Sequence, residues 1–233
     1  MIPKEKVLIV IPAGGKGTRL HSLTHDHWQK AATPLQEKTP IEHILDMYQK
    51  RGFSHFLILV NHLQDSVKKK LEKYENVHIL YSEDPSDLPG KTGALYHAYR
   101  KGLLDKAKLL LIHNGADIIL NFPDFPTFII EKHLKQKKLV SIVTLQSPTS
   151  LVNMTPIKKN EYHFAVTLLS SEVIQQFPSF FPLSLTPDFE KALFPELIKR
   201  NELHTIRIPQ KHCFPLKTPE DYKHLQKALW QKS

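Results

Sequence analysis

The residues with the clearest chemical potential lie near the N-terminus, where the segment AGGKGTRL occupies positions 13–20. It follows the apolar run VLIVIP, which is typical of a buried strand. Glycines carry no Cβ, so they let a backbone approach a ligand closely. Backbone amides together with Lys16 and Arg19 would attract an anion. The other interpretation is a tight turn with two solvated cations, and this segment alone does not decide between them.

A carboxylate follows a second apolar run. In HNGAD (113–117), Asp117 comes soon after KLLLIH (108–113). Ligands of open α/β sheets bind beyond the carboxyl ends of the strands, so Asp117 and the glycine-rich segment should meet at one edge. That pairing suits a nucleoside triphosphate with Mg²⁺, which prefers oxygen ligands. Alternatively, Asp117 forms a turn. The glycine spacing matches neither the P-loop nor G-x-G-x-x-G.

The elements that must position these residues alternate between strand and helix. Apolar runs predict strands at 6–12, 56–60, 77–81, 108–113 and 139–145. Helical spacing predicts helices between Thr39 and Gly52, around 67–74, and over 93–104 and 125–136. The first of these helices carries a capping-box pattern, Thr39 with Glu42. The alternation predicts an α/β fold with a mostly parallel sheet covered by helices on both faces.

The last third of the chain has a different character. It is rich in proline between 178 and 195, with short strands, a helical stretch around 189–200 and a closing helix over 219–230. No linker-like composition separates this part from the rest. We therefore expect a single domain spanning residues 1–233.

Composition limits the function classes. The formal net charge of +9 favours anionic partners, but the lysines are scattered and no nucleic-acid motif stands out, so we expect no nucleic-acid partner. No apolar run approaches the length of a membrane span, and the apolar segment after Lys6 fits a first strand better than a signal peptide. The single cysteine, Cys213, fits a reducing compartment, so we expect a cytoplasmic protein without a membrane partner. The fourteen histidines show no metal-ligand spacing.

Several segments together resemble the sugar-1-phosphate nucleotidyltransferases. The glycine-rich segment is followed by QKAATPL (29–35) and TPIEHILDMYQKRGF (39–53), as in that family. LPGKTGALYHA (88–98), DFEKALFPELIKRNELHTIRI (188–208) and KTPEDYKHLQKAL (217–229) resemble its later motifs. The resemblance implies a GT-A-like, Rossmann-like fold, with a nucleotide-binding half over 1–150 and a sugar-binding half over 151–233.

The resemblance also implies roles for individual residues. Arg19, Lys30 and Asp117 would be catalytic, with Arg19 on the leaving pyrophosphate, Lys30 on the α-phosphate and Asp117 as a ligand of Mg²⁺, although Ala116 shifts the register before it. The residues that would line the nucleotide are Ala13, Gly14, Gly15, Gly17, Thr18 and Gly93. Lys159 and His163 would contact the sugar phosphate.

The chain departs from the family pattern in its sugar half. The family's second metal-binding aspartate falls at Pro215, and Lys217 stands where a glycine is usual. Lys217 can point inward, which would bring positive charge to the metal site, or outward to solvent. Lys158 and His163 replace a glutamate and an asparagine, and Lys91 replaces a threonine. The nucleotide half is therefore expected to be retained and the sugar half to be rewritten.

The reaction implied by the resemblance is transfer of a nucleoside monophosphate from an NTP to a sugar 1-phosphate, with release of pyrophosphate. The expected partners are these two substrates, and a homo-oligomer is also compatible with the sequence. The alternative is a weak or inactive nucleotide-binding relative that acts as a regulatory or partner subunit. The base and the sugar are not determined by the sequence.

Overall fold

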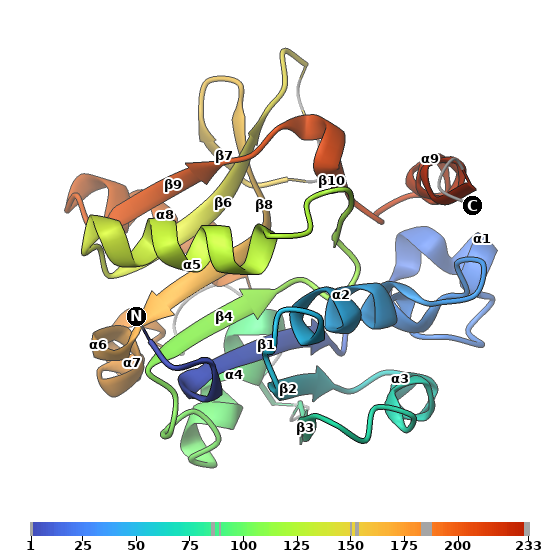
Figure 1. Cartoon of the computed structure of the whole chain (residues 1–233), viewed down its shortest axis with the longest axis horizontal. Helices are drawn as coiled ribbons and strands as arrows, with labels where there is room; N and C mark the ends of the chain where they lie inside the picture. The colour runs from blue at the N-terminus through green and yellow to red at the C-terminus, as the bar shows by residue number, and fades with distance from the viewer. Residues whose placement is uncertain are drawn as a thin grey trace.

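A central sheet organises the computed structural model of the chain, which describes residues 2–84, 87–88, 90–149, 151, 154–182 and 188–230. Within these ranges the sheet has eight strands, in the order β3-β2-β1-β4-β8-β6-β9, with β7 paired to β8 (Figure 1). It runs through both halves of the sequence, because β8 and β9 pair with strands from the first half. Ser150, the predicted boundary between the halves, and Pro89 of the second glycine motif lie outside the described residues.

Four parallel strands form the N-terminal part of the sheet. They are β1 (Val7–Ala13), β2 (His55–Val60), β3 (His78–Glu83) and β4 (Leu109–His113). β1 pairs in parallel with both β2 and β4, and β2 pairs in parallel with β3. The interior strands β1, β2 and β4 are almost wholly buried, as expected for apolar runs covered on both faces. These strands lie where the sequence predicted them.

The other strands complete the sheet in mixed orientation. β8 (Glu161–Ser170) lies antiparallel between β4 and β6 (Val140–Gln146), and β9 (Leu203–Arg207) is parallel to β6. β7 (Pro156–Lys158) forms a hairpin with β8. The ten-residue β8 corrects the expectation of only short strands in this region. The fold is α/β with a mostly parallel sheet, as predicted.

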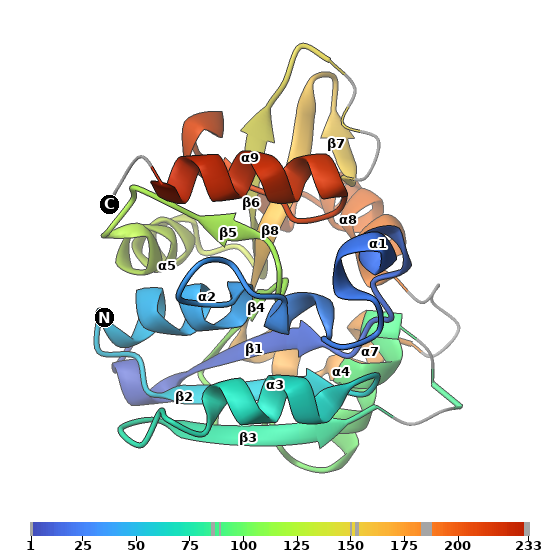
Figure 2. The ribbon, with the colours of Figure 1, turned by 90° about the vertical axis from the view of Figure 1, so that its right-hand side faces the viewer.

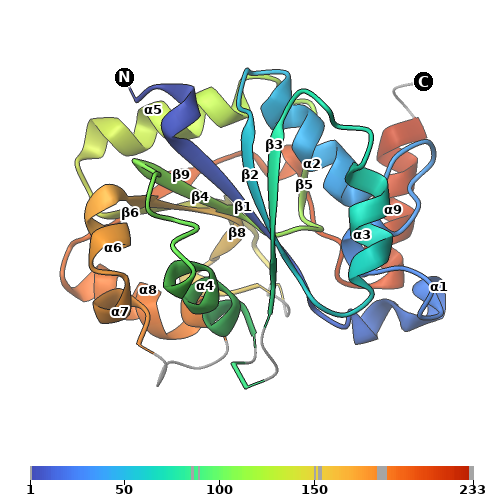
Figure 3. The same cartoon turned by 90° about the horizontal axis from the view of Figure 1, so that it is seen from below.

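Helices cover both faces of the sheet (Figure 3). One face carries α2 (Pro40–Gln49), α3 (Gln64–Leu71) and α5 (Phe125–Gln136), whose apolar side chains join one core cluster. The other carries α4 (Gly90–Arg100), α6 (Ser171–Gln175), α7 (Phe177–Phe180) and α8 (Phe189–Lys199), which form a second cluster. The capping box of α2 is present, because the backbone N–H of Thr39 donates to Glu42 Oε2 at 2.7 Å.

A small second sheet brings the end of the chain back to β4. β5 (Ile118–Ile119) directly follows the turn after β4 and pairs antiparallel with β10 (Cys213–Phe214). The closing helix α9 (Pro219–Trp230) packs Leu225 and Leu229 against this pair (Figure 2). Residues about 100 positions apart in sequence are thereby placed side by side. Within the described ranges, no helix combines the length and apolar character that crossing a membrane requires.

Candidate active site

The glycine-rich segment forms an open loop at the carboxyl end of β1. Gly17 has φ +63°, a left-handed conformation that glycine adopts without strain, and it leads into a short 3₁₀ turn, Thr18–Leu20. A Cβ on Gly15 would meet nothing within 4 Å. On Gly14 it would lie 2.4 Å from Asp84 Oδ2. The loop therefore offers bare backbone at Gly15 and close packing at Gly14.

Lys30 is held beneath this loop by a second 3₁₀ turn, Lys30–Ala32. Gln29 Nε2 donates to the Gly15 carbonyl at 3.1 Å, and Gln29 Oε1 accepts from the Ala31 amide. These bonds fix Lys30 relative to the glycine loop. Burial, reinforced by the charge of Lys217, lowers the pKa of Lys30 to about 8. Sequence reasoning found Lys30 but not Gln29, which positions it.

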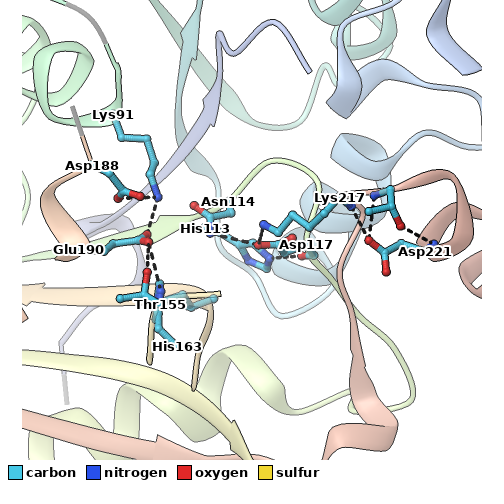
Figure 4. Close-up of polar contacts among 12 residues, drawn as sticks. Lys91, His113, Asn114, Asp117, Thr155, His163, Asp188, Glu190, Lys217 and Asp221 are labelled. Carbon is cyan, nitrogen blue, oxygen red and sulfur yellow. Dashed lines mark hydrogen bonds and ion pairs between the residues drawn. The ribbon is translucent and has the colours of Figure 1, made fainter. Parts of the chain in front are cut away.

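Asp117 lies in the turn that follows β4, and its side chain is buried (Figure 4). Asp117 Oδ2 accepts from Lys217 Nζ at 2.8 Å and from Asn114 Nδ2 at 3.1 Å. Burial by itself would raise the pKa of Asp117, but the charges of Lys217 and Lys30 outweigh it and hold the pKa below its usual value. The additional residue Ala116 packs with Leu20 and Leu216, so the shifted register still directs Asp117 into the site.

Lys217 points inward, which settles the orientation that the sequence left open. Its side chain is only 16% exposed. Asp221 Oδ2 accepts from the backbone N–H groups of Lys217 at 2.8 Å and Thr218 at 2.9 Å, ahead of α9. Asp221 therefore caps this helix rather than facing Asp117. Pro215, at the position of the family's second aspartate, follows β10 directly.

Two adjacent cavities meet at these residues. The first cavity, of about 430 Å³, is lined by the glycine loop and by residues that follow β2, β3 and β4, among them Asn61, Asp84 and Gly115. The second cavity, of about 310 Å³, lies toward β8 and α8 and includes Arg19, Asp117 and Glu190. Four side chains line both cavities: Lys30, Lys91, Asn114 and Lys217.

The second cavity contains a buried polar cluster (Figure 4). Glu190, 6% exposed, accepts from Lys91 Nζ at 2.5 Å and lies 3.5 Å from His163 Nδ1. Thr155 Oγ1 donates to the same carboxylate at 3.4 Å, and Asp188 is 3.5 Å from Lys91 Nζ. Burial alone would raise the pKa of Glu190, but His163 and Lys91 hold it well below its usual value. Sequence reasoning did not predict Glu190, the centre of this cluster.

The predicted site residues divide into those that the cavities bring together and those that they do not. The predicted residues that line a cavity are Gly14, Gly15, Gly17, Arg19, Lys30, Asp117 and His163. Ala13 is buried at the end of β1, and Thr18 begins the 3₁₀ turn. Gly93 is packed against backbone, since a Cβ there would lie 2.1 Å from the Leu88 carbonyl oxygen. Lys159 is exposed on the turn between β7 and β8, outside the lining of both cavities.

Asp84 is a further residue that sequence reasoning missed. It follows β3, lines the first cavity, and its Oδ1 has no hydrogen-bond partner among the described residues. Burial, with the nearby charge of Glu83, raises the pKa of Asp84 to about 7. The signal that could have found it is topological, because every parallel strand delivers its following residue to the same edge of the sheet.

The side chains present do not fit a Mg²⁺ ion held by the protein alone. Among the described residues, no group of three or more His, Cys, Asp or Glu side chains is arranged to hold a metal. Asp117 is the carboxylate at the expected position. Its Oδ1 is buried without a partner, but its Oδ2 already accepts from Lys217 and Asn114. An ammonium group in this contact would repel a divalent cation.

A glycine loop with converging cations, at the carboxyl edge of a mostly parallel sheet, is typical of α/β proteins that bind phosphate groups. Comparison with known families makes the assignment specific. The model of the nucleotidyl transferase family matches residues 8–151. The chain belongs to this family.

Individual relatives agree with this assignment. A UTP–glucose-1-phosphate uridylyltransferase from Synechocystis is 25% identical over 154 residues, which cover 62% of this chain and 38% of that protein. The match thus spans well under half the length of that relative.

Solved structures show the same GT-A-like fold across nearly the whole chain. A UDP-glucose pyrophosphorylase complexed with UDP-glucose superposes with a TM-score of 0.76 at 13% identity, over 97% of this chain and 99% of that one. A Bacillus anthracis protein assigned as a glucose-1-phosphate thymidylyltransferase, in complex with sucrose, gives a TM-score of 0.73 at 16% identity, over 95% of this chain and 94% of that one.

Proposed function

We propose that this protein transfers a nucleoside monophosphate from an NTP to a sugar 1-phosphate or a related phosphorylated acceptor and releases pyrophosphate. The observation that supports this proposal is that Lys30 and Lys217 line both cavities, between the open glycine loop of the first cavity and Arg19 of the second. Family membership and the names of the relatives support the reaction class.

In the proposed reaction, an oxygen of the acceptor phosphate attacks the α-phosphorus of the NTP in line. A new phosphorus–oxygen bond forms, the bond from the α-phosphorus to the bridging oxygen breaks, and the electron pair leaves with pyrophosphate. The protein supplies orientation and charge neutralisation rather than a nucleophile. The backbone at Gly15 would approach the phosphates, and Lys30 and Arg19 would stabilise the charge that develops on them.

The first cavity suits the nucleotide and the second suits the acceptor. Lys30 and Lys217 line both cavities, so a phosphate at their junction would be within reach of both substrates. Asp84 lies in the first cavity, among the residues that follow the parallel strands, where its carboxyl group would face the nucleoside. His163 also lines the second cavity. It would affect the acceptor through Glu190, with which it is paired.

Pyrophosphate release tests this function. Purified protein is assayed with each of the four common NTPs and dTTP against a panel of sugar 1-phosphates, with Mg²⁺ and separately with EDTA. We expect release with at least one substrate pair, and loss of that release in Lys30→Ala. Lys135→Ala is the matched control, because Lys135 is an exposed lysine on α5, outside both cavities. Nucleotide binding without release in any combination would favour the non-catalytic relative instead.

A further inference from the structure

The ion pair between Lys217 and Asp117 occupies the junction of the two cavities. Lys217 Nζ lies 2.8 Å from Asp117 Oδ2, and the two side chains are 16% and 3% exposed. Lys217 lines both cavities. Its ammonium group therefore sits where the phosphates of the proposed substrates would meet, which is the position that the family resemblance assigned to Mg²⁺.

The lysine is fixed in this position by its backbone. β10 pairs with β5, which directly follows Asp117 in the chain. Asp221 then fixes the amides of Lys217 and Thr218 at the start of α9. Asn114 holds the acceptor side of the pair by donating to Asp117 Oδ2. The ammonium is thus held on two sides before any ligand binds, unlike a surface lysine on a flexible stem.

The charge balance at the junction is positive without a metal. Lys30, Arg19 and Lys217 line the second cavity around Asp117, and Lys91 is already paired with Glu190. Lys191 and Asp188 also line this cavity, so five cations stand against the three acids Asp117, Asp188 and Glu190, and two positive charges remain uncompensated. The surplus suits a polyphosphate anion, whereas a divalent cation would have to displace Lys217 from the carboxylate that it already contacts.

We propose that the Lys217 ammonium group replaces the divalent cation in this protein, so that it binds free nucleotide without Mg²⁺. This inference rests on the nucleotide site of the proposed function. Asp117 then positions Lys217 rather than a metal. Asp117 takes one of the three N–H donors of the ammonium, which leaves two for phosphate oxygens, without the octahedral geometry of Mg²⁺.

Calorimetry with nucleotide provides the first test. The best-binding NTP is titrated into the wild-type protein in excess EDTA and in excess Mg²⁺, and the affinity in EDTA is expected to equal or exceed that in Mg²⁺. Lys217→Met keeps most of the length of the side chain and removes its charge. It is expected to lose about tenfold or more in affinity in EDTA, as for loss of a charge-assisted contact. Binding that requires Mg²⁺ would overturn the inference.

Metal binding provides a second test that needs no nucleotide. Mn²⁺ is titrated into the free protein and followed by electron paramagnetic resonance. We expect no tight binding by the wild type and a new Mn²⁺ site in Lys217→Asp, because two carboxylates then face each other. Adding Asp117→Asn should abolish that site. The inference would be wrong if the wild type bound Mn²⁺ tightly. It would also be wrong if a folded Lys217→Asp protein gained no Mn²⁺ binding, because Lys217 would then not replace the divalent cation.

The two tests separate this inference from the proposed function. A wild-type protein that binds no nucleotide in either buffer would overturn both. Nucleotide binding that depends on Mg²⁺ would overturn only the role of Lys217 and leave the transferase proposal standing. Circular dichroism of each variant confirms that lost binding is not lost structure, and Lys217→Met serves if Lys217→Asp fails to fold.

Discussion

The two cavities share a wall, and cations outnumber acids in both, but the cavities differ in how many of their charges are paired within the protein. The first cavity is lined by Lys16, Lys30, Lys91 and Lys217 and, among the described residues, by one acid, Asp84. In the second cavity, each acid has a cationic partner within the protein, as in the Lys217–Asp117 and Lys91–Glu190 pairs. In the first cavity, Lys16 and Lys30 form no ion pair among the described residues and remain available to a ligand, whereas in the second cavity all three acids are paired with a cation.

Because of this difference, substitutions in the first cavity should affect mainly ligand binding, and substitutions of paired residues in the second should affect mainly folding stability. A ligand of the first cavity would neutralise cations that the fold leaves uncompensated, so removing one of them should weaken binding more than folding. In the second cavity, removing one member of an ion pair would leave a buried charge without its partner, which is costly in a poorly solvated environment. Variants in the two cavities therefore test the comparison directly.

The largest effect is expected for Glu190→Ala. Lys91 and His163 would lose their shared partner in a buried position, although Asp188 remains near Lys91. The free energy of unfolding should fall by about 3 kcal/mol, the lower end of what breaking a buried pair costs. Urea denaturation measures this change. Glu196→Ala on the same helix is the control, because Glu196 is exposed and its ion-pair partner in the described structure is the exposed Lys199. Equal stability of the two variants would contradict the structural role of the second cavity.

The next largest effect concerns nucleotide affinity. Lys30→Ala and Arg19→Ala each remove a charge-assisted contact to phosphate, worth about 1.5–3 kcal/mol, or roughly ten- to a hundredfold in affinity. Both variants should unfold at urea concentrations close to that of the wild type, in contrast to Glu190→Ala. Calorimetric titration with NTP measures the binding. If neither variant changed affinity or turnover, the glycine loop would be only a turn.

The parts of this structure that sequence predicted are those encoded locally. The strands β1, β2 and β4 are continuous apolar runs, which is the pattern expected of parallel strands that are buried on both faces. β8 was missed because polar residues, among them His163 and Thr167, interrupt its apolar pattern although they are buried. The helix predicted over 93–104 instead spans Gly90–Arg100, and Gly102, at φ +68°, lies just beyond its end.

The site shows the same division. The glycine loop, Lys30 and Asp117 lie in short segments whose residue pattern predicts a binding site. The ion-pair partners of Asp117 and Lys91 lie far away in the sequence, so no such pattern predicts them. Lys217 is 100 residues from Asp117, and Glu190 is 99 residues from Lys91. These contacts depend on the pairing of β5 with β10 and on the packing of α8, which no local pattern specifies.

A smaller effect is expected from pH. Burial and the charge of Lys217 lower the pKa of Lys30 to about 8, so the free protein loses this charge as the pH rises through 8. With that pKa the charged fraction falls from about 90% at pH 7 to about 10% at pH 9, and nucleotide affinity should fall by up to about tenfold. Lys30→Arg stays charged throughout this range, so its affinity should vary less. Equal pH profiles for both proteins would indicate that Lys30 does not bind phosphate in its charged form.

The smallest effect is expected in the free energy of unfolding, when one buried alanine from each half of the sheet is replaced with glycine. Ala13, at the end of β1, and Ala165, in β8, are both almost fully buried, at 1% and 2% exposure. Only Ala165 has a left-handed backbone, φ +59°, where the β6–β8 pairing is irregular and the Ala165 carbonyl accepts from the Asn114 amide. Replacing either alanine with glycine costs a buried methyl group and backbone entropy, together about 1.5 kcal/mol.

At Ala165 the same replacement also relieves about 1–2 kcal/mol of left-handed strain. Ala165→Gly should therefore change the free energy of unfolding by less than about 0.5 kcal/mol, whereas Ala13→Gly should lower it by about 1.5 kcal/mol. Urea denaturation of both variants under the same conditions measures the difference. Equal losses would show that the bulge beside Asn114 stores no strain. A near-neutral Ala165→Gly would show that β8 tolerates an unfavourable backbone conformation at the edge of the site.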